Sequence, residues 1–430
     1  MTIRVQVEGA VSPASAKAFT DDVRGAFRVL SQVRRDVGLP ASKITAILAE
    51  DFVATVDSHR KWPDRVDEGG RFSVERLGGV VAAKNLQQDD EGREVVIVFS
   101  NHWAEPENTV ARLRALFCVA HELTHPIIVR ARYAAGVMKD VPHPSFTGWE
   151  VARSIARIVS DEFRADALAA LYVGAIVTMD RDGGSPVPAK TWWAWGDDVM
   201  TAAREALEAA YPLWPDTVLR YRIGQIQLAE LWQRVADFAS QSLTMLAHGQ
   251  AEMQAADAGE FAEADTIAAL PAMRLYLAEP WREFLTAIRA EAVLEPLSKM
   301  PAAEERLCEA GQKAVYEIWR RLGVTIELHD NRQWGMNVDD PIWDSQDLSN
   351  GGGCRAIVKD PDIAGGTPMF AGTHVPVDFL RDYLAAGQSL DDFLVQFPSV
   401  SQEVAVAALQ ELRSTEDETG HPATPDRKQS

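Results

Sequence analysis

The chain has 430 residues, of which 47% are hydrophobic and 25% charged, and its formal net charge is −20. A chain of this length corresponds to two to four domains. Its acidic excess argues against a broad surface for nucleic acid or anionic lipid. Three widely spaced cysteines predict no disulfide framework and a reducing compartment. The first residues lack the apolar segment of a secretion signal, and the longest apolar run is too short for a bilayer. We therefore expect a cytoplasmic protein without a membrane partner.

The N-terminal segment predicts one strand and two helices. Residues 1–10 alternate as in an edge strand, residues 12–37 have helical periodicity, and a second helix is expected from Ser42 through Phe52. Two short helices leave a helix-turn-helix open. Acidic side chains cancel the basic ones there, however, which favours packing against the next domain. After a short strand at 79–83, the β-branched segment Glu94 to Ser100 is the clearest strand. A strand hairpin at this point can pair with an extended peptide.

An apolar helical run, expected to begin near residues 106–109, contains His121-Glu122-Leu123-Thr124-His125. Positions i and i+4 lie on one face of a helix, so His121 and His125 can bind one metal ion while Glu122 reaches a water molecule beside it. Five such residues also arise by chance, with histidines that only form hydrogen bonds. The flanking residues predict a buried helix, where two histidines and a glutamate are costly unless bonded. Cys118 is expected to be a core residue. The pattern is typical of zinc hydrolases.

A second helix, expected over 149–177, supplies the remaining candidates. Glu162 and Asp166 are four residues apart and share one face. We expect Glu162 to be the third metal ligand and Asp166 to accept the second N–H of a ligating histidine. Asp161 is a rival ligand, although Arg157 four residues earlier predicts a surface ion pair. Zinc is the expected metal, while manganese and iron also suit two histidines and one glutamate.

The predicted chemistry is hydrolysis of a peptide bond. Zinc would lower the pKa of its water towards about 7 and polarise the peptide carbonyl. Glu122 would act as the general base. The sequence does not choose the donor that stabilises the oxyanion; the candidates are His102, Tyr133, His143 and Tyr172.

The order of these motifs resembles the ImmA/IrrE family of metallopeptidases over about 80 residues, from Val95 to Leu171. The resemblance rests on the strand before the helix, the HExxH motif and the later Glu162-x-x-Ala165-Asp166 segment. It implies a bacterial protein with a zincin-like fold, zinc bound by the two histidines and Glu162, and a regulatory protein as substrate. Three features depart from the family: Thr124 replaces a common glycine, the insertion before Glu162 is long, and Pro126 is expected to bend or stop the helix.

Residues 198–328 predict a bundle of three to five helices without a catalytic constellation. Glycine and proline residues are expected to separate these helices, at Gly249, Gly259, Pro271 and Pro280. His248 and His329 stand alone in the sequence, and we expect no role for them. Three nearby tryptophans either line a binding groove or anchor one domain on another, and the anchor is favoured: Trp192, Trp193 and Trp195.

The C-terminal segment begins with short strands and glycine turns, then predicts three short helices with Ser389 and Ser401 as N-caps. Its Gly366-Thr367-Pro368 and Gly372-Thr373-His374-Val375-Pro376-Val377 motifs resemble the antitoxin-like domain-of-unknown-function 433 family. That resemblance implies a helix-turn-helix-like module. Residues 355 to 413 contain four basic and eight acidic residues, a net charge of −4. This favours protein contact or homo-oligomer formation over DNA binding.

The sequence thus predicts a mostly helical α+β chain. Its parts are a zincin-like metallopeptidase domain (1–180), a helical bundle (190–330), a linker (331–354), an antitoxin-like domain (355–413) and a disordered tail (414–430). The first hypothesis is a zinc-dependent endopeptidase of regulatory type that cleaves a specific protein partner, such as a repressor or antitoxin. The alternative is a non-enzymatic toxin–antitoxin-like or transcription-associated regulator with a structural or inactive metal site. The complete set of His121, Glu122, His125 and Glu162 favours the enzyme.

Overall fold

The protein is mostly helical with several short sheets, which confirms the α+β class. The computed structural model describes residues 2–31, 43–61, 75–76, 79–80, 83–89, 92–101, 109–137, 148–181, 201, 203–208, 217, 221, 226–255, 260–291, 295–328, 334–338, 356–358, 368–370, 373, 375–385, 388–397, 400–402 and 404–409. They fall into two compact units, Met1–Ala210 with Gln233–Asp339 and Tyr211–Trp232 with Asp340–Ser430. None of the described helices combines the length and apolar character needed to cross a membrane. The domain boundaries expected from sequence stay a prediction.

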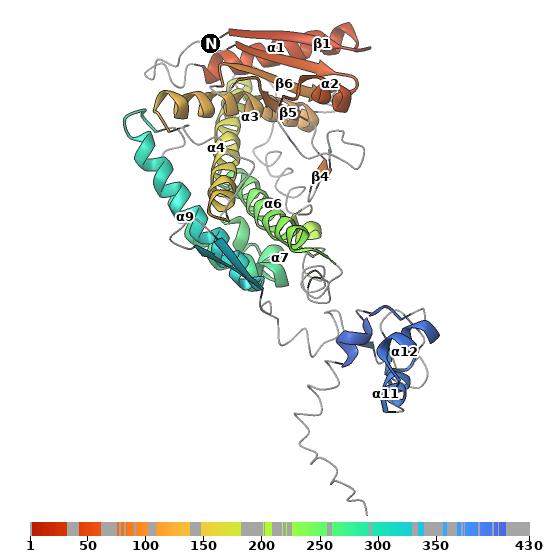
Figure 1. Cartoon of the computed structure of the whole chain (residues 1–430). Coiled ribbons are helices and arrows are strands. Elements are labelled where there is room, and N and C mark those ends of the chain that lie inside the picture. The colour runs from red at the N-terminus through yellow and green to blue at the C-terminus, as the bar shows by residue number, and fades with distance from the viewer. Residues whose placement is uncertain are drawn as a thin grey trace, which may run out of the picture. The chain divides into compact units, whose positions relative to one another are not determined.

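A four-stranded sheet lies at the N-terminal end of the first unit, in the order β1 (Thr2–Glu8), β2 (Lys43–Ala49), β6 (Glu94–Ser100), β5 (Ala83–Gln87) (Figure 1). The first three strands are parallel, and β5 pairs antiparallel with β6. The edge strand and the β6 strand are therefore confirmed. The short strand expected at 79–83 is divided between β4 (Gly79–Val80), which pairs with β3 (Glu75–Arg76), and the start of β5.

The helix expected from Ser42 was wrong, because that segment forms β2, and α2 (Phe52–His59) begins only after it. The helix-turn-helix alternative is lost with it. Strand β2 lies between β1 and β6 and is buried on both faces, as are most central strands of parallel sheets. Such a strand has a continuous apolar run that periodicity cannot separate from a buried helix.

Helices cover both faces of this sheet. On one face, α1 (Pro13–Leu30), α3 (Thr109–Ala134) and α4 (Gly148–Arg181) build the larger core together with inward residues of β6 such as Ile97 and Phe99. On the other face α2 packs against Val98 and Leu86. Alternate residues of β6 thus serve the two cores, as the two-residue period of a strand requires. The larger core fixes α3 and α4 against each other and positions the candidate site.

Helix α3 continues for eight residues past Pro126, so this proline does not stop the helix. Proline has no backbone N–H and leaves the carbonyl four residues earlier without its helical donor. That carbonyl belongs to Glu122, and it accepts a hydrogen bond from Asn85 Nδ2 on β5 at 2.7 Å. A side chain of the sheet therefore replaces the missing helical bond and ties β5 to the HExxH turn.

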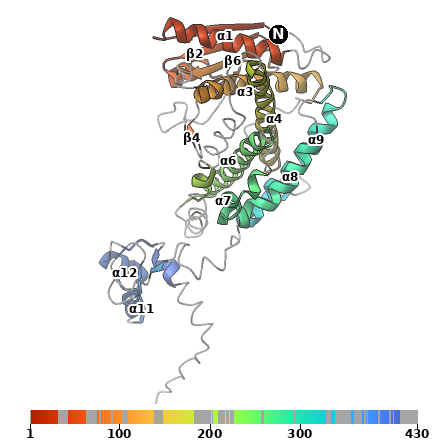
Figure 2. The same ribbon diagram turned by 180° about the vertical axis from the view of Figure 1, so that it is seen from behind.

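The remainder of the first unit is largely helical, as predicted. It comprises α6 (Leu228–Ala255) from Gln233 onward, η4 (Phe261–Glu263), α7 (Asp265–Ala268), the π-helix η5 (Met273–Leu277), α8 (Ala278–Ala290) and α9 (Met300–Arg321). Helix α9 packs on both α4 and α8 (Figure 2). The predicted helical stretch ends earlier than expected, because β7 (Val324–Leu328) pairs with β8 (Trp334–Val338) inside the expected linker.

Helix α6 passes through Gly249, where a break was expected. A Cβ atom at this position would lie 2.4 Å from the ring of Phe261, which is fully buried. The glycine thus permits close packing of Phe261 against the helix. The next residue strengthens the same contact, since Gln250 Oε1 accepts the backbone N–H of Phe261 at 3.0 Å.

The second unit contains the C-terminal module. A small antiparallel pair, β9 (Ile357–Val358) and β10 (Met369–Phe370), precedes α11 (Val377–Ala385) and α12 (Leu390–Gln396), and residues 404–409 are also helical. Both predicted N-caps are confirmed: Ser389 forms a capping box with Asp392, and Ser401 Oγ accepts the Val404 N–H at 3.3 Å. Phe370 and Phe393 are fully buried in the core of this module.

Candidate metal centre

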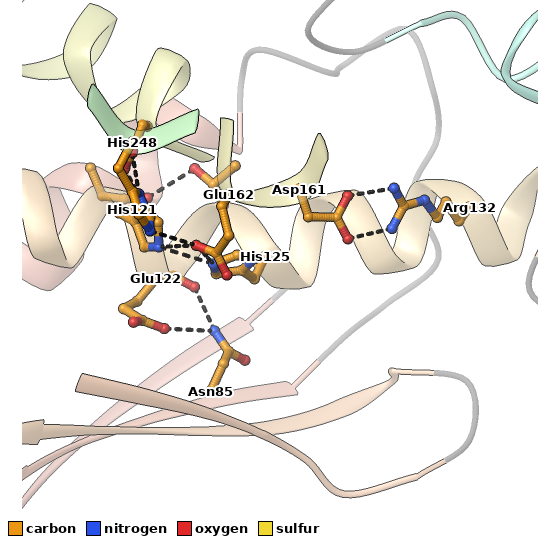
Figure 3. A network of polar contacts seen from close by, with 11 residues as sticks. Asn85, His121, Glu122, His125, Arg132, Asp161, Glu162 and His248 are labelled. Atoms are coloured by element: carbon orange, nitrogen blue, oxygen red, sulfur yellow. Dashed lines mark hydrogen bonds and ion pairs between the residues drawn. The ribbon is translucent and has the colours of Figure 1, made fainter. Parts of the chain in front are cut away.

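Two helices bring the predicted ligands together. His121 and His125 lie one turn apart on α3, and Glu162 comes from α4, which packs against α3 (Figure 3). One ligand atom from each of these residues lies within 4.8 Å of the others. The His121 and His125 Nε2 atoms are 3.0 Å apart, and Glu162 Oε2 lies 3.2 Å from the first and 3.6 Å from the second. Their side chains keep 13%, 18% and 23% of their exposure, so solvent reaches the cluster.

Asp166 supports the cluster from the next turn of α4. Its Oδ1 atom lies 2.6 Å from His121 Nδ1, and its side chain is almost fully buried. A histidine that donates Nδ1–H to a carboxylate presents the lone pair of Nε2 on its other side. The contact therefore orients His121 Nε2 towards Glu162, which is the arrangement predicted for Asp166.

Opposite charges stabilise one another in this cluster. Burial alone lowers the pKa of His121, but the Asp166 and Glu162 carboxylates outweigh it and raise that pKa well above its usual value. Burial alone raises the pKa of Glu162, but His125 and His121 lower it well below the usual range. The Glu162 carboxylate is therefore held as an anion beside two imidazole rings, the form that binds a cation.

Glu122 is held at the edge of the sheet. Asn85 Nδ2 on β5 bonds to its backbone carbonyl and also lies 3.3 Å from its carboxylate Oε2 (Figure 3). Burial lowers the pKa of His125, but Glu162 outweighs it and, with a smaller contribution from the Glu122 carboxylate, raises that pKa above its usual value. Sequence reasoning missed Asn85. The signal was present in Pro126, which predicts an unpaired carbonyl at Glu122 but does not name its donor.

His248 also lies at the site, although the sequence predicted an isolated histidine. Its Nδ1 atom lies 2.5 Å from Asp166 Oδ2, and its Nε2 atom lies 3.9 Å from Glu162 Oε2 (Figure 3). It comes from α6, more than eighty residues beyond Glu162. Burial lowers its pKa, but Asp166 and Glu162 reverse this and raise it to about 9. No local sequence pattern linked this histidine to Asp166.

The other candidates lie elsewhere. Tyr172 packs towards α1, where its hydroxyl would be 3.4 Å from a Cβ at Gly25, and Tyr133 lies against the Arg130 guanidinium. His102, His143 and the tryptophans of residues 192–195 fall outside the described residues. Cys118 packs against the larger core as expected. Burial first, then the nearby Glu122 and Asp166 charges, raises the pKa of its thiol well above the usual value.

Asp161 lies outside the cluster of the three candidate ligands, and its partner is Arg132 and not the expected Arg157. Arg132 also bonds Glu304 on α9 at 2.6 Å, and Glu304 accepts from Arg164 at 2.5 Å. Arg132, Arg164 and Glu304 are all buried. This ionic network joins α3, α4 and α9 one residue away from Glu162, and it holds the two site helices against each other.

The fold and the cluster together define a mostly helical α+β protein whose two imidazole nitrogens and one carboxylate oxygen suit a divalent ion such as zinc, manganese or iron. Residues 357–410 match the family described as "Protein of unknown function (DUF433)", which confirms the C-terminal resemblance. No curated protein and no solved structure matches the chain. The family match does not extend to residues 95–171, so their resemblance to ImmA/IrrE stays a prediction.

Proposed function

We propose that the protein is a metal-dependent endopeptidase, with zinc held by His121, His125 and Glu162. The observation that carries this proposal is the convergence of their three ligand atoms from α3 and α4 beside Glu122, at a position that solvent reaches. A bound zinc ion would supply Lewis acidity and lower the pKa of a water molecule. The residues fit the ion because Asp166 already fixes His121 with Nε2 towards Glu162.

Each residue then has a defined task. Glu122 is the general base, and it takes the proton of the attacking water and passes it to the leaving amine. Asn85 holds the base by bonding both its backbone carbonyl and its carboxylate. Asp166 keeps His121 in the ligating tautomer. Glu162 supplies a negative charge that neutralises part of the charge on the cation.

The position of β5 favours an extended polypeptide as substrate. Among the described strands β5 is one of the two edges of its sheet, and its Asn85 reaches the HExxH turn. A peptide can add to such an edge through backbone hydrogen bonds. A chain paired along β5 would then run past Glu122, with its peptide groups close to the cluster.

We further propose that the C-terminal module contacts a protein, either the substrate or a second copy of this chain. Three apolar side chains on α11 and α12 are exposed: Phe379 at 45%, Leu384 at 37% and Val395 at 82%. The acidic excess of residues 355–413 disfavours phosphate backbones. A cytoplasmic location accords with both proposals.

The test combines metal analysis with peptide cleavage. Purified parent protein should contain about one zinc ion per chain, and Glu162→Ala should lose most of it, because one of three ligands is gone. Zinc-loaded parent protein is then incubated with a peptide library and the products are read by mass spectrometry. Cleavage should appear with the parent and disappear with Glu122→Gln, which should keep its zinc. A parent that binds no supplied metal would refute the proposal, and a metal-loaded parent without cleavage would favour the non-enzymatic regulator.

A further inference from the structure

The imidazole of His248 lies beside the candidate centre without belonging to its three-ligand cluster. Its ring centroid is 5.9 Å from that of His121, while the rings of His121 and His125 are 4.8 Å apart. Its Nε2 atom approaches Glu162 Oε2 to 3.9 Å, a longer separation than that of either ligand histidine. The side chain is 34% exposed, more than any of the three ligands. His248 thus stands at the solvent side of the cluster, where a substrate would arrive.

One carboxylate orients both histidines. Asp166 Oδ1 contacts His121 Nδ1 at 2.6 Å, and Asp166 Oδ2 contacts His248 Nδ1 at 2.5 Å. Because each Nδ1 is occupied by the same buried carboxylate, each ring presents Nε2 on its other side. In His121 that atom faces the metal-ligand cluster. In His248 it remains available for a hydrogen bond to a bound molecule.

The backbone that carries His248 is fixed by close packing. Gly249 allows the buried Phe261 ring to approach α6, and Gln250 bonds the backbone of Phe261. Gly249 and Gln250, the two residues after His248, therefore both fix this turn of α6 against Phe261. A side chain that only filled surface space would not need a carboxylate partner on one side and an immobilised backbone on the other.

We propose that His248 is a further catalytic residue, which makes a hydrogen bond through Nε2 to the peptide group that is hydrolysed. This inference rests on the proposed endopeptidase function and deepens it. It assigns to α6 the substrate contact for which sequence reasoning had considered only His102, Tyr133, His143 and Tyr172. The contact would orient the peptide group against Glu122 and the three ligands, so His248 touches substrate while Asp166 acts only through the two histidines.

The experiment uses the full chain loaded with cobalt(II), whose visible absorption reports on the ligands, and acetohydroxamate as a probe that carries a peptide-like carbonyl and N–H. His248→Ala should bind cobalt with an affinity within about threefold of the parent, since all three ligands remain. Its affinity for acetohydroxamate should fall about 5- to 15-fold, the effect of one lost hydrogen bond. His59→Ala is the matched control: His59 lies on α2, 3.8 Å from Glu8, and its loss should change neither affinity.

Each other outcome overturns the inference in a distinguishable way. Equal acetohydroxamate affinity in parent and His248→Ala would show that Nε2 does not contact the probe, and tighter binding in the variant would mean that His248 obstructs the position. Loss of cobalt affinity with unchanged probe affinity would reduce His248 to a support for Asp166. A cobalt-loaded parent that binds no acetohydroxamate would remove the substrate contact but keep the metal cluster. A parent that binds no cobalt would remove the proposed function itself.

Discussion

Because Asn85 bonds the Glu122 carbonyl in place of the backbone N–H that Pro126 lacks, we expect the stability effects of substitutions at Asn85 and Pro126 to be coupled. Asn85→Ala removes the donor at 2.7 Å and leaves a carbonyl that proline has already deprived of its helical partner. The half-buried position allows some solvation, so the variant should lose about 1–2 kcal/mol of unfolding free energy. Pro126→Ala restores an N–H that can bond this carbonyl within the helix. In that background Asn85→Ala should cost only about 0.5 kcal/mol, a coupling energy of about 1 kcal/mol.

The assay is a double-mutant cycle on the metal-free protein in the presence of EDTA. The free energy of unfolding of each variant is measured in urea, with the helical circular dichroism signal as the monitor. Gln87→Ala provides the control, because Gln87 is also a half-buried amide on β5 but bonds the Asp89 carbonyl. Its cost should be the same in the parent and in the Pro126→Ala background. If Asn85→Ala costs equally in both backgrounds, within about 0.3 kcal/mol, the replacement of a helical bond by Asn85 is refuted.

Two further predictions concern buried carboxylates. Glu304→Gln removes the negative charge between the buried Arg132 and Arg164. The free energy of unfolding, measured in urea, should fall by about 3 kcal/mol. A loss below about 1 kcal/mol would contradict a stabilising role of the ionic network. Burial, aided by the charge of Asp166, raises the pKa of Glu252 to about 8, and its Oε2 atom has no partner among the described residues. A carboxyl group whose pKa is raised by folding costs stability as pH rises from its unfolded value near 4.5 to about 8. We therefore compare the free energy of unfolding of metal-free Glu252→Gln with that of the parent. The variant should gain about 3–5 kcal/mol relative to the parent between pH 4.5 and pH 8. A difference that stays constant over that interval would exclude titration of a buried Glu252 carboxyl group.

Sequence reasoning succeeded where the cause was local. The i, i+4 spacing places His121 above His125, and the same spacing places Glu162 above Asp166, so two helices suffice once they are packed together. The β6 strand followed from its β-branched residues, and the Ser389 cap from its position before an apolar helical run. In each case a few neighbouring residues determine the backbone.

It failed where the deciding partner is distant. The segment of β2 is apolar on both faces because it is a central strand of a sheet that helices cover on both sides, and this neighbourhood is a property of the folded chain. Pro126 would interrupt an isolated helix, but Asn85, 41 residues earlier, supplies the replacement donor. Gly249 would mark a break in an isolated sequence, while the folded chain uses it to admit Phe261. These three features violate local rules, and each violation marks a tertiary contact.

The same reasoning explains why the site extends beyond the segment that first suggested it. The resemblance to ImmA/IrrE predicted from the sequence is confined to Val95 to Leu171. Asp166, however, also contacts His248 of α6, and Glu304 of α9 bonds Arg164, two residues after Glu162. A buried aspartate between two imidazoles and a buried glutamate between two guanidinium groups are stable only with all partners present. Helices α6 and α9 therefore contribute partners to the buried charges beside the candidate ligands. They neutralise the charges on which the ligand geometry depends, so we expect the metal centre to need both halves of this unit.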